Sequence, residues 1–115
     1  MNLEWEMSKF RTLDLAIEYY SLIERIKLPH HLREQIPRAA SSVSLNLAEG
    51  NAKLSYLDKK RIYQIALGSF RESQTILKLG RVEDREVERV ADHLGACLYK
   101  LTTFQVPNKQ KSPSP

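Results

Sequence analysis

Apolar residues recur at steps of three and four over four segments of the chain, a spacing typical of helices that bury one face. The chain has only four glycines and five prolines, which favours long helices over many short strands. We therefore predict an all-α protein, an antiparallel up-down-up-down four-helix bundle. The bundle should span residues 1–107, with helices at about 10–27, 32–53, 56–80 and 84–105, and a flexible tail at 108–115.

The first segment carries two apolar stripes on opposite sides of the predicted helix. A bundle helix needs one stripe for its own core, so the other remains on the surface unless a second molecule covers it. The far side of the second segment is also small and apolar. These leftover faces predict self-association. One stripe of the first segment is Leu13, Ile17 and Tyr20, and the opposite stripe is Leu15, Tyr19, Leu22 and Ile26. The far side of the second segment consists of Ser41, Leu45, Ala48 and Ala52.

Pro37 lies inside the second predicted helix, where it cannot donate a hydrogen bond to the carbonyl of Arg33. It should either kink that helix or mark its true first turn. The third helix has a clearer start, because Ser55 and Asp58 resemble a capping box. Its apolar stripe is predicted to be Ile62, Ile65, Ala66, Phe70, Ile76 and Leu77.

Polar residues gather on one face of each of the two central helices. Ser42, Asn46 and Glu49 share a face of the second helix, and Ser69, Glu72 and Ser73 share a face of the third. Antiparallel packing would bring the two groups together. We favour a hydrogen-bonded network that sets the register of these helices. The alternative is a Glu49–Glu72 carboxylate pair for acid–base work or for a metal.

The remaining residues offer little for catalysis. His30 and His31 follow one another where a helix begins, and His93 stands alone, so we expect surface or capping roles for them. Cys97 lies on an apolar stripe and should be a core thiol. The chain has no Glu-x-x-His pair, Gly-rich phosphate loop, nucleophile elbow or Cys-x-x-Cys. We therefore predict no enzyme activity, no catalytic residue, no metal site and no cofactor.

The charge of the chain permits an anionic partner, since its formal net charge is +4. From Lys59 to Arg81 there are six basic residues against one acid. Such a face can simply be solvated, but repetition of the patch in an oligomer favours binding. The residues we expect to contact the phosphates of RNA or another nucleic acid are Arg38, Lys53, Lys60, Arg71 and Lys78.

Two features of the sequence bear on its compartment. No apolar run approaches about 18 residues, the length of a membrane span, and the N-terminal residues lack the design of a signal peptide. Cys97 is the single cysteine, which excludes an internal disulfide and fits a reducing environment. We expect a cytoplasmic protein with no membrane partner.

Two motifs resemble those of a known family. The first motif is Gln35-Ile36-Pro37-Arg38-Ala39-Ala40-Ser41-Ser42-Val43-Ser44-Leu45-Asn46-Leu47-Ala48-Glu49-Gly50, and the second is Ile65-Ala66-Leu67-Gly68-Ser69-Phe70-Arg71-Glu72. They are similar to the sequence blocks of bacterial four-helix-bundle proteins encoded by intervening sequences of large-subunit (23S) rRNA genes. The resemblance spans about residues 10–79, and Pro37 departs from the usual pattern. It implies a homopentameric ring with a basic surface, and kinship to accessory proteins of diversity-generating retroelements, which bind nucleic acid and a reverse transcriptase.

The sequence thus predicts a non-enzymatic homo-oligomer that binds structured RNA or a ribonucleoprotein through basic faces. The alternative is a protein-binding adaptor, for example for a reverse transcriptase. Such an adaptor would use apolar outer faces, at residues such as Leu15 and Leu45, or the basic rim of the ring.

Overall fold

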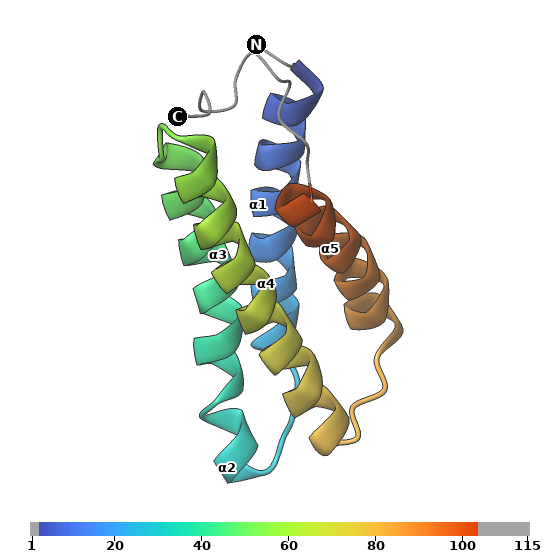
Figure 1. Cartoon of the computed structure of the whole chain (residues 1–115). Coiled ribbons are helices and arrows are strands. Elements are labelled where there is room, and N and C mark those ends of the chain that lie inside the picture. Colours follow the sequence, from blue (N-terminus) through green and yellow to red (C-terminus); the bar gives the residue numbers. More distant parts are fainter. Residues whose placement is uncertain (1–2, 104–115) are drawn as a thin grey trace.

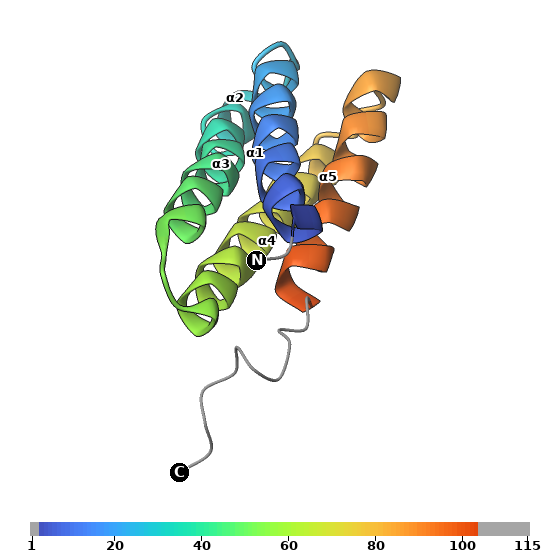
Figure 2. The same cartoon turned by 90° about the horizontal axis from the view of Figure 1, so that it is seen from above.

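A computed structural model describes residues 3–103 of the chain. Four long helices and one single-turn helix form the described part, which contains no strand, and this confirms the predicted all-α class (Figure 1). Neighbouring long helices run in opposite directions, and the view from above shows α1 beside α3 (Figure 2). The elements are α1 (Leu3–Ile23), α2 (His30–Arg33), α3 (Ile36–Ala52), α4 (Tyr56–Leu79) and α5 (Arg85–Thr103).

The four long helices pack around one core in the order α1, α3, α4, α5, and each contacts the next, with α5 closing back on α1. The contact between α3 and α4 is the most extensive. Across the diagonal, Tyr19 of α1 packs against Phe70 of α4, with ring centroids 5.5 Å apart. At one end of the bundle, Trp5 lies against Tyr56 and Tyr63 in the same way. The diagonal helices are therefore joined by aromatic side chains.

The predicted bounds of the first helix, 10–27, are wrong at both ends. The helix starts at Leu3, because Trp5 can bury its ring on α4, and because Glu4 and Glu6 lie near the positive end of the helix dipole. It ends at Ile23, and residues 24–26 continue as turns whose backbone amides bond to the last helical carbonyls. The predicted ends of the fourth helix at 105 and of the bundle at 107, and the tail at 108–115, lie outside the described residues.

Pro37 stands in the first turn of α3, which settles whether it kinks a helix or starts one. The first turn needs no backbone donor, so a proline costs nothing there. The predicted helix at 32–53 is consequently wrong at its start: α2 ends at Arg33, and α3 begins at Ile36. Ser55 caps α4 as expected, since its hydroxyl accepts a hydrogen bond from the Asp58 amide at 3.1 Å.

The structure buries one apolar stripe of α1 and divides the other, because Leu13 and Tyr20 are partly buried against the core. Leu15 and Tyr19 are buried, whereas Phe10 is 61% exposed and Ile17 is also exposed. The expectation that Leu15 lies on an outer face is therefore wrong, while Leu45 of α3 is indeed exposed. On α4 the predicted core residue Ile65 is exposed, and the missed residue Tyr63 is fully buried. None of the helices described is long and apolar enough to cross a membrane.

Candidate nucleic-acid interface

The outer face of α4 carries three of the predicted phosphate-binding residues. Lys60, Arg71 and Lys78 follow one another at 11 and 7 residues, which places them on one side of the helix, about 16 and 10 Å apart along its axis. Arg71 and Lys78 are exposed, and Lys60 is half-buried. The opposite side of α4 carries the buried residues Ile62 and Ile76. The cations are therefore held outward by the same packing that buries the apolar side.

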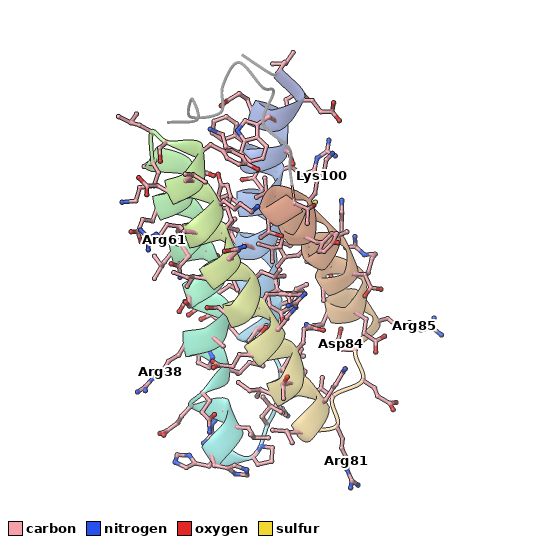
Figure 3. All side chains as sticks on the ribbon, in the orientation of Figure 1. Arg38, Arg61, Arg81, Asp84, Arg85 and Lys100 are labelled. Carbon is pink, nitrogen blue, oxygen red and sulfur yellow. The ribbon has the colours of Figure 1, made fainter. Side chains whose placement is uncertain are left out.

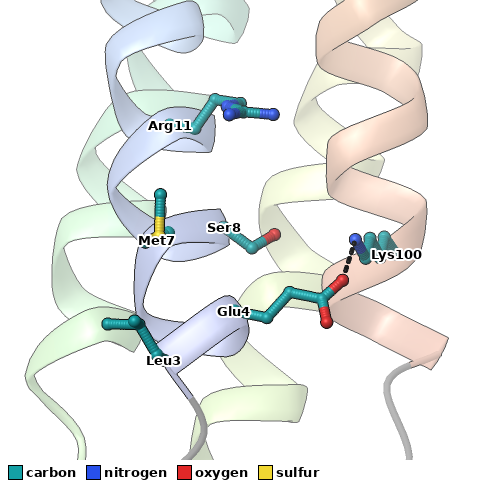
Figure 4. Close-up of a pocket in the computed structure, with 6 residues that line it drawn as sticks. All are labelled: Leu3, Glu4, Met7, Ser8, Arg11 and Lys100. Atoms are coloured by element: carbon teal, nitrogen blue, oxygen red, sulfur yellow. Dashed lines mark ion pairs between the residues drawn. The ribbon is translucent and has the colours of Figure 1, made fainter.

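Three other cations, Arg25, Arg89 and Lys100, instead lie close to acids across the seam between α1 and α5. Arg25 lies 3.8 Å from Glu86, and Arg89 lies 3.8 Å from Glu18. Lys100 pairs with Glu4 at 3.6 Å (Figure 4).

No ion pair reaches Lys60, Arg71 or Lys78 from the residues that the structure describes. Lys78 lines a groove together with Asp84 and Glu88, so the uncompensated positive charge of this face lies mainly at Lys60 and Arg71. A phosphate could approach these side chains without displacing an existing partner.

Arg38 and Lys53 occupy different positions. Arg38 lies in the first turns of α3 and is exposed, pointing away from the ribbon (Figure 3). Lys53 caps the other end of α3, and its ammonium lies 3.8 Å from the carboxylate of Glu49. The structure thus brings Lys60, Arg71 and Lys78 onto one face, with Arg38 on the adjacent helix and Lys53 partly neutralised.

Two neighbouring basic residues were left out of the predicted set. Arg61 is exposed and points outward near the start of α4 (Figure 3). Arg61 lies about 100° around the helix from Lys60, so the spacing that links Lys60, Arg71 and Lys78 does not include it. Lys59, in contrast, donates to the carbonyls of Gly50 and Asn51 at 3.3 and 3.0 Å, and so caps the end of α3. Burial, and then the nearby ammonium of Lys9, lower the pKa of Lys59.

The predicted polar network forms between α3 and α4, but with three members. The Ser42 and Ser69 hydroxyls lie 2.9 Å apart, and the Asn46 amide donates to the Ser42 carbonyl and hydroxyl at 2.8 and 3.0 Å. Glu49 and Glu72 are exposed and stay outside it. A carboxylate that faces water avoids the cost of burying its charge.

A second polar group crosses the core from α1 to α4, and of its members only Ser73 was predicted to be part of a polar face, while Tyr19 and Gln74 were not. The Tyr19 hydroxyl lies 2.7 Å from the Ser73 hydroxyl, which itself donates to the Phe70 carbonyl at 2.6 Å. Gln74 donates to the Tyr19 oxygen at 2.8 Å. Burial raises the pKa of Tyr19, and these hydrogen bonds partly offset that rise. The position of Ser73 within an apolar stripe was the available signal, since a buried hydroxyl needs a partner.

The described residues include no group of three or more His, Cys, Asp or Glu side chains that could hold a metal ion. One cleft among the described residues is an open groove of about 310 Å³ between α1 and α5 (Figure 4). Arg11 and Ser8 line this groove together with the Glu4–Lys100 ion pair. The surface therefore offers charge for contact with a large partner more clearly than an enclosed site for a small one.

Four long helices around one core, with cations on an outer face, define the class of small helical-bundle proteins. The sequence profile of one family, described as 23S rRNA-intervening sequence protein, matches residues 9–100. The chain belongs to this family. No curated protein and no solved structure matches the chain.

Proposed function

We propose that the protein is a non-enzymatic, cytoplasmic homo-oligomer, a pentamer by resemblance, that binds RNA through the outer face of α4. The observation that carries the proposal is the set of cations on this face, Lys60, Arg71 and Lys78, which have no acidic partner among the described residues. Phosphate groups are the natural partners of such a face.

The chemistry of this face supports contact with the RNA backbone rather than with bases. Lys60, Arg71 and Lys78 are spread over about 26 Å of the helix, which suits a row of phosphates. The exposed side chains between them include Gln64 and Thr75, which add polar contacts but no stacking ring. Binding should therefore depend strongly on salt and weakly on sequence.

A second candidate function is favoured by the exposed apolar side chains at the start of α4. Leu54, in the loop before this helix, is fully exposed, and Leu57 in its first turn is exposed as well. An adaptor that binds a protein partner, such as a reverse transcriptase, would cover these side chains. Leu45 of α3 is available to such a partner, whereas Leu15 is buried and is not.

The test compares two triple variants with the same change in net charge. One carries Lys60→Gln, Arg71→Gln and Lys78→Gln. The control carries Arg25→Gln, Arg89→Gln and Lys100→Gln, which removes the cations that are paired between α1 and α5. Binding of a fluorescent RNA hairpin is measured by anisotropy over a range of salt concentrations, and circular dichroism verifies that both variants are helical.

The α4 variant should bind at least about tenfold more weakly, and the slope of log affinity against log salt should fall by about 2, because three phosphate contacts are lost. The control should keep the wild-type slope. Equal losses in the two variants would show that only net charge matters. Wild-type binding by the α4 variant would refute the assignment of this face.

A further inference from the structure

The outer side of α1 is an apolar stripe that no part of the described chain covers. Leu3, Met7, Phe10 and Ile17 are all more than half exposed and lie at steps of four, three and seven residues. This spacing places them on one side of the helix, opposite its buried side, with the exposed Asp14 in the gap between Phe10 and Ile17. An uncovered stripe of this length indicates a surface that packs against another helix.

The outer side of α3 has the complementary shape. Leu45, which is 69% exposed, lies there between Ser41 and Ala48, and Ala52 continues the line toward the end of the helix. Small residues leave a shallow groove along a helix, and large side chains of a facing helix can fill it. The large residues of α1 and the small residues of α3 thus match in size.

Charges beside the two faces match only when the helices are antiparallel. Arg11 precedes Glu18 on α1, on the flank toward α5, and Arg38 precedes Glu49 on α3, on the flank toward α4. In an antiparallel pair these flanks meet, and Arg11 lies toward Glu49 of the next copy while Glu18 lies toward its Arg38. In a parallel pair, like charges would be aligned along the two helices instead.

The present partners of the two acids do not prevent this exchange. Glu18 lies 3.8 Å from Arg89, and Glu49 lies 3.8 Å from Lys53, between side chains that are well exposed. Ion pairs of this kind contribute little to stability, so they can be replaced or extended at an interface. Arg11 and Arg38 have no acidic partner among the described residues.

The arrangement of the bundle makes the same pairing possible in a closed ring. In the protomer, α1 and α3 are neighbours that run in opposite directions (Figures 1 and 2). If copies are related by rotation about an axis along the bundle, α1 of one copy is automatically antiparallel to α3 of the next. The outward sides of two adjacent corners point about a right angle apart, so a head-to-tail series turns in one direction and closes into a small ring.

We infer that the outer stripe of α1 packs, antiparallel and head-to-tail, on the outer side of α3 of the next copy. This inference rests on the self-association contained in the proposed function and names the two surfaces that make it. The ring is lined on its inside by the edge between α1 and α3. The outer face of α4, with Lys60, Arg71 and Lys78, then lies on the outside, where RNA can reach it.

Disulfide cross-linking tests the pairing. In a Cys97→Ser background, Leu45→Cys is combined with Phe10→Cys in one variant and with Asp14→Cys, one turn further along α1, in a second. In the matched control, the α1 cysteine is combined with Leu79→Cys in place of Leu45→Cys, since Leu79 of α4 is 66% exposed and belongs to neither surface. Each single cysteine variant is prepared as well. After mild oxidation, linked species are separated on non-reducing denaturing gels.

At least one Leu45→Cys double variant should give a ladder of linked copies, while the single variants and the Leu79→Cys control stay as single chains. Linked pairs from Phe10→Cys alone would instead reveal a symmetric contact between two α1 helices and would overturn the inference. Unlinked double variants would also overturn it. RNA binding by the wild-type protein is scored separately, so a ladder without binding refutes only the proposed function, and binding without a ladder refutes only this inference.

Discussion

Gly50, near the end of α3, is packed tightly against Tyr63 of α4. A Cβ atom built there would lie 2.7 Å from Cε1 and 2.9 Å from Cδ1 of Tyr63. Tyr63 is fully buried, and its hydroxyl donates to the Asn51 side chain at 2.6 Å, so its ring cannot easily move away. Gly68, in the middle of α4, is the matched control, because nothing lies within 4 Å of the corresponding position.

The two alanine substitutions should change stability in opposite directions. Gly68→Ala should raise the free energy of unfolding by about 1 kcal/mol, the difference in helix propensity between the two residues. Gly50→Ala gains the same propensity but crowds the core, which typically costs about 1–3 kcal/mol. The gap between the variants should therefore be about 2 kcal/mol, or about 8 °C in melting temperature for a chain of this size.

Urea unfolding followed by circular dichroism gives this comparison directly. The midpoint should rise for Gly68→Ala and fall for Gly50→Ala, with the same dependence on denaturant in both, since the surface exposed on unfolding hardly changes. Equal gains in the two variants would show that Tyr63 yields without cost. The close packing assigned to the α3–α4 contact would then be wrong.

Two further predictions concern buried tyrosines. Tyr19→Phe should lower the free energy of unfolding by about 1–2 kcal/mol, because Gln74 loses its hydrogen-bond acceptor in the core. The control Tyr99→Phe, on the surface, should change the free energy of unfolding by less than about 0.5 kcal/mol. Similar losses for both variants in urea unfolding would contradict the role of the buried hydroxyl. Burial, and then the Glu6 carboxylate, raise the pKa of Tyr63, so the unfolded chain releases this proton from about pH 10 while the folded protein keeps it. Stability should therefore fall as pH rises above about 10, and the fall should be shallower in Tyr63→Phe; identical pH profiles of the urea midpoint would refute this cause.

The parts of the fold that could be predicted from the sequence are those in which one local pattern dominates. The start of α4 follows from the Ser55–Asp58 cap, and the outward position of Arg71 and Lys78 follows from their spacing. The meeting of Ser42 with Ser69 was also predictable, because antiparallel helices bring the middle of one against the middle of the other.

The predictions that were wrong concern features that depend on contacts between distant segments of the chain. Both stripes of α1 are apolar enough to form a core, and only the packing of Tyr19 against Phe70 selects one of them. The early start of α1 depends on Trp5 reaching α4, which no local pattern shows. Glu49 shares a helix face with Asn46, but spacing alone could not show that its carboxylate remains at the surface.

The mass of the particle, measured by light scattering after chromatography in low and in high salt, tests the central claim most directly. Absorbance at two wavelengths reports co-purified nucleic acid in the same experiment. The account predicts a particle of several 13.3 kDa chains that carries nucleic acid in low salt and loses it in high salt while remaining assembled. A single chain free of nucleic acid in both conditions would contradict both the oligomer and its role in binding RNA.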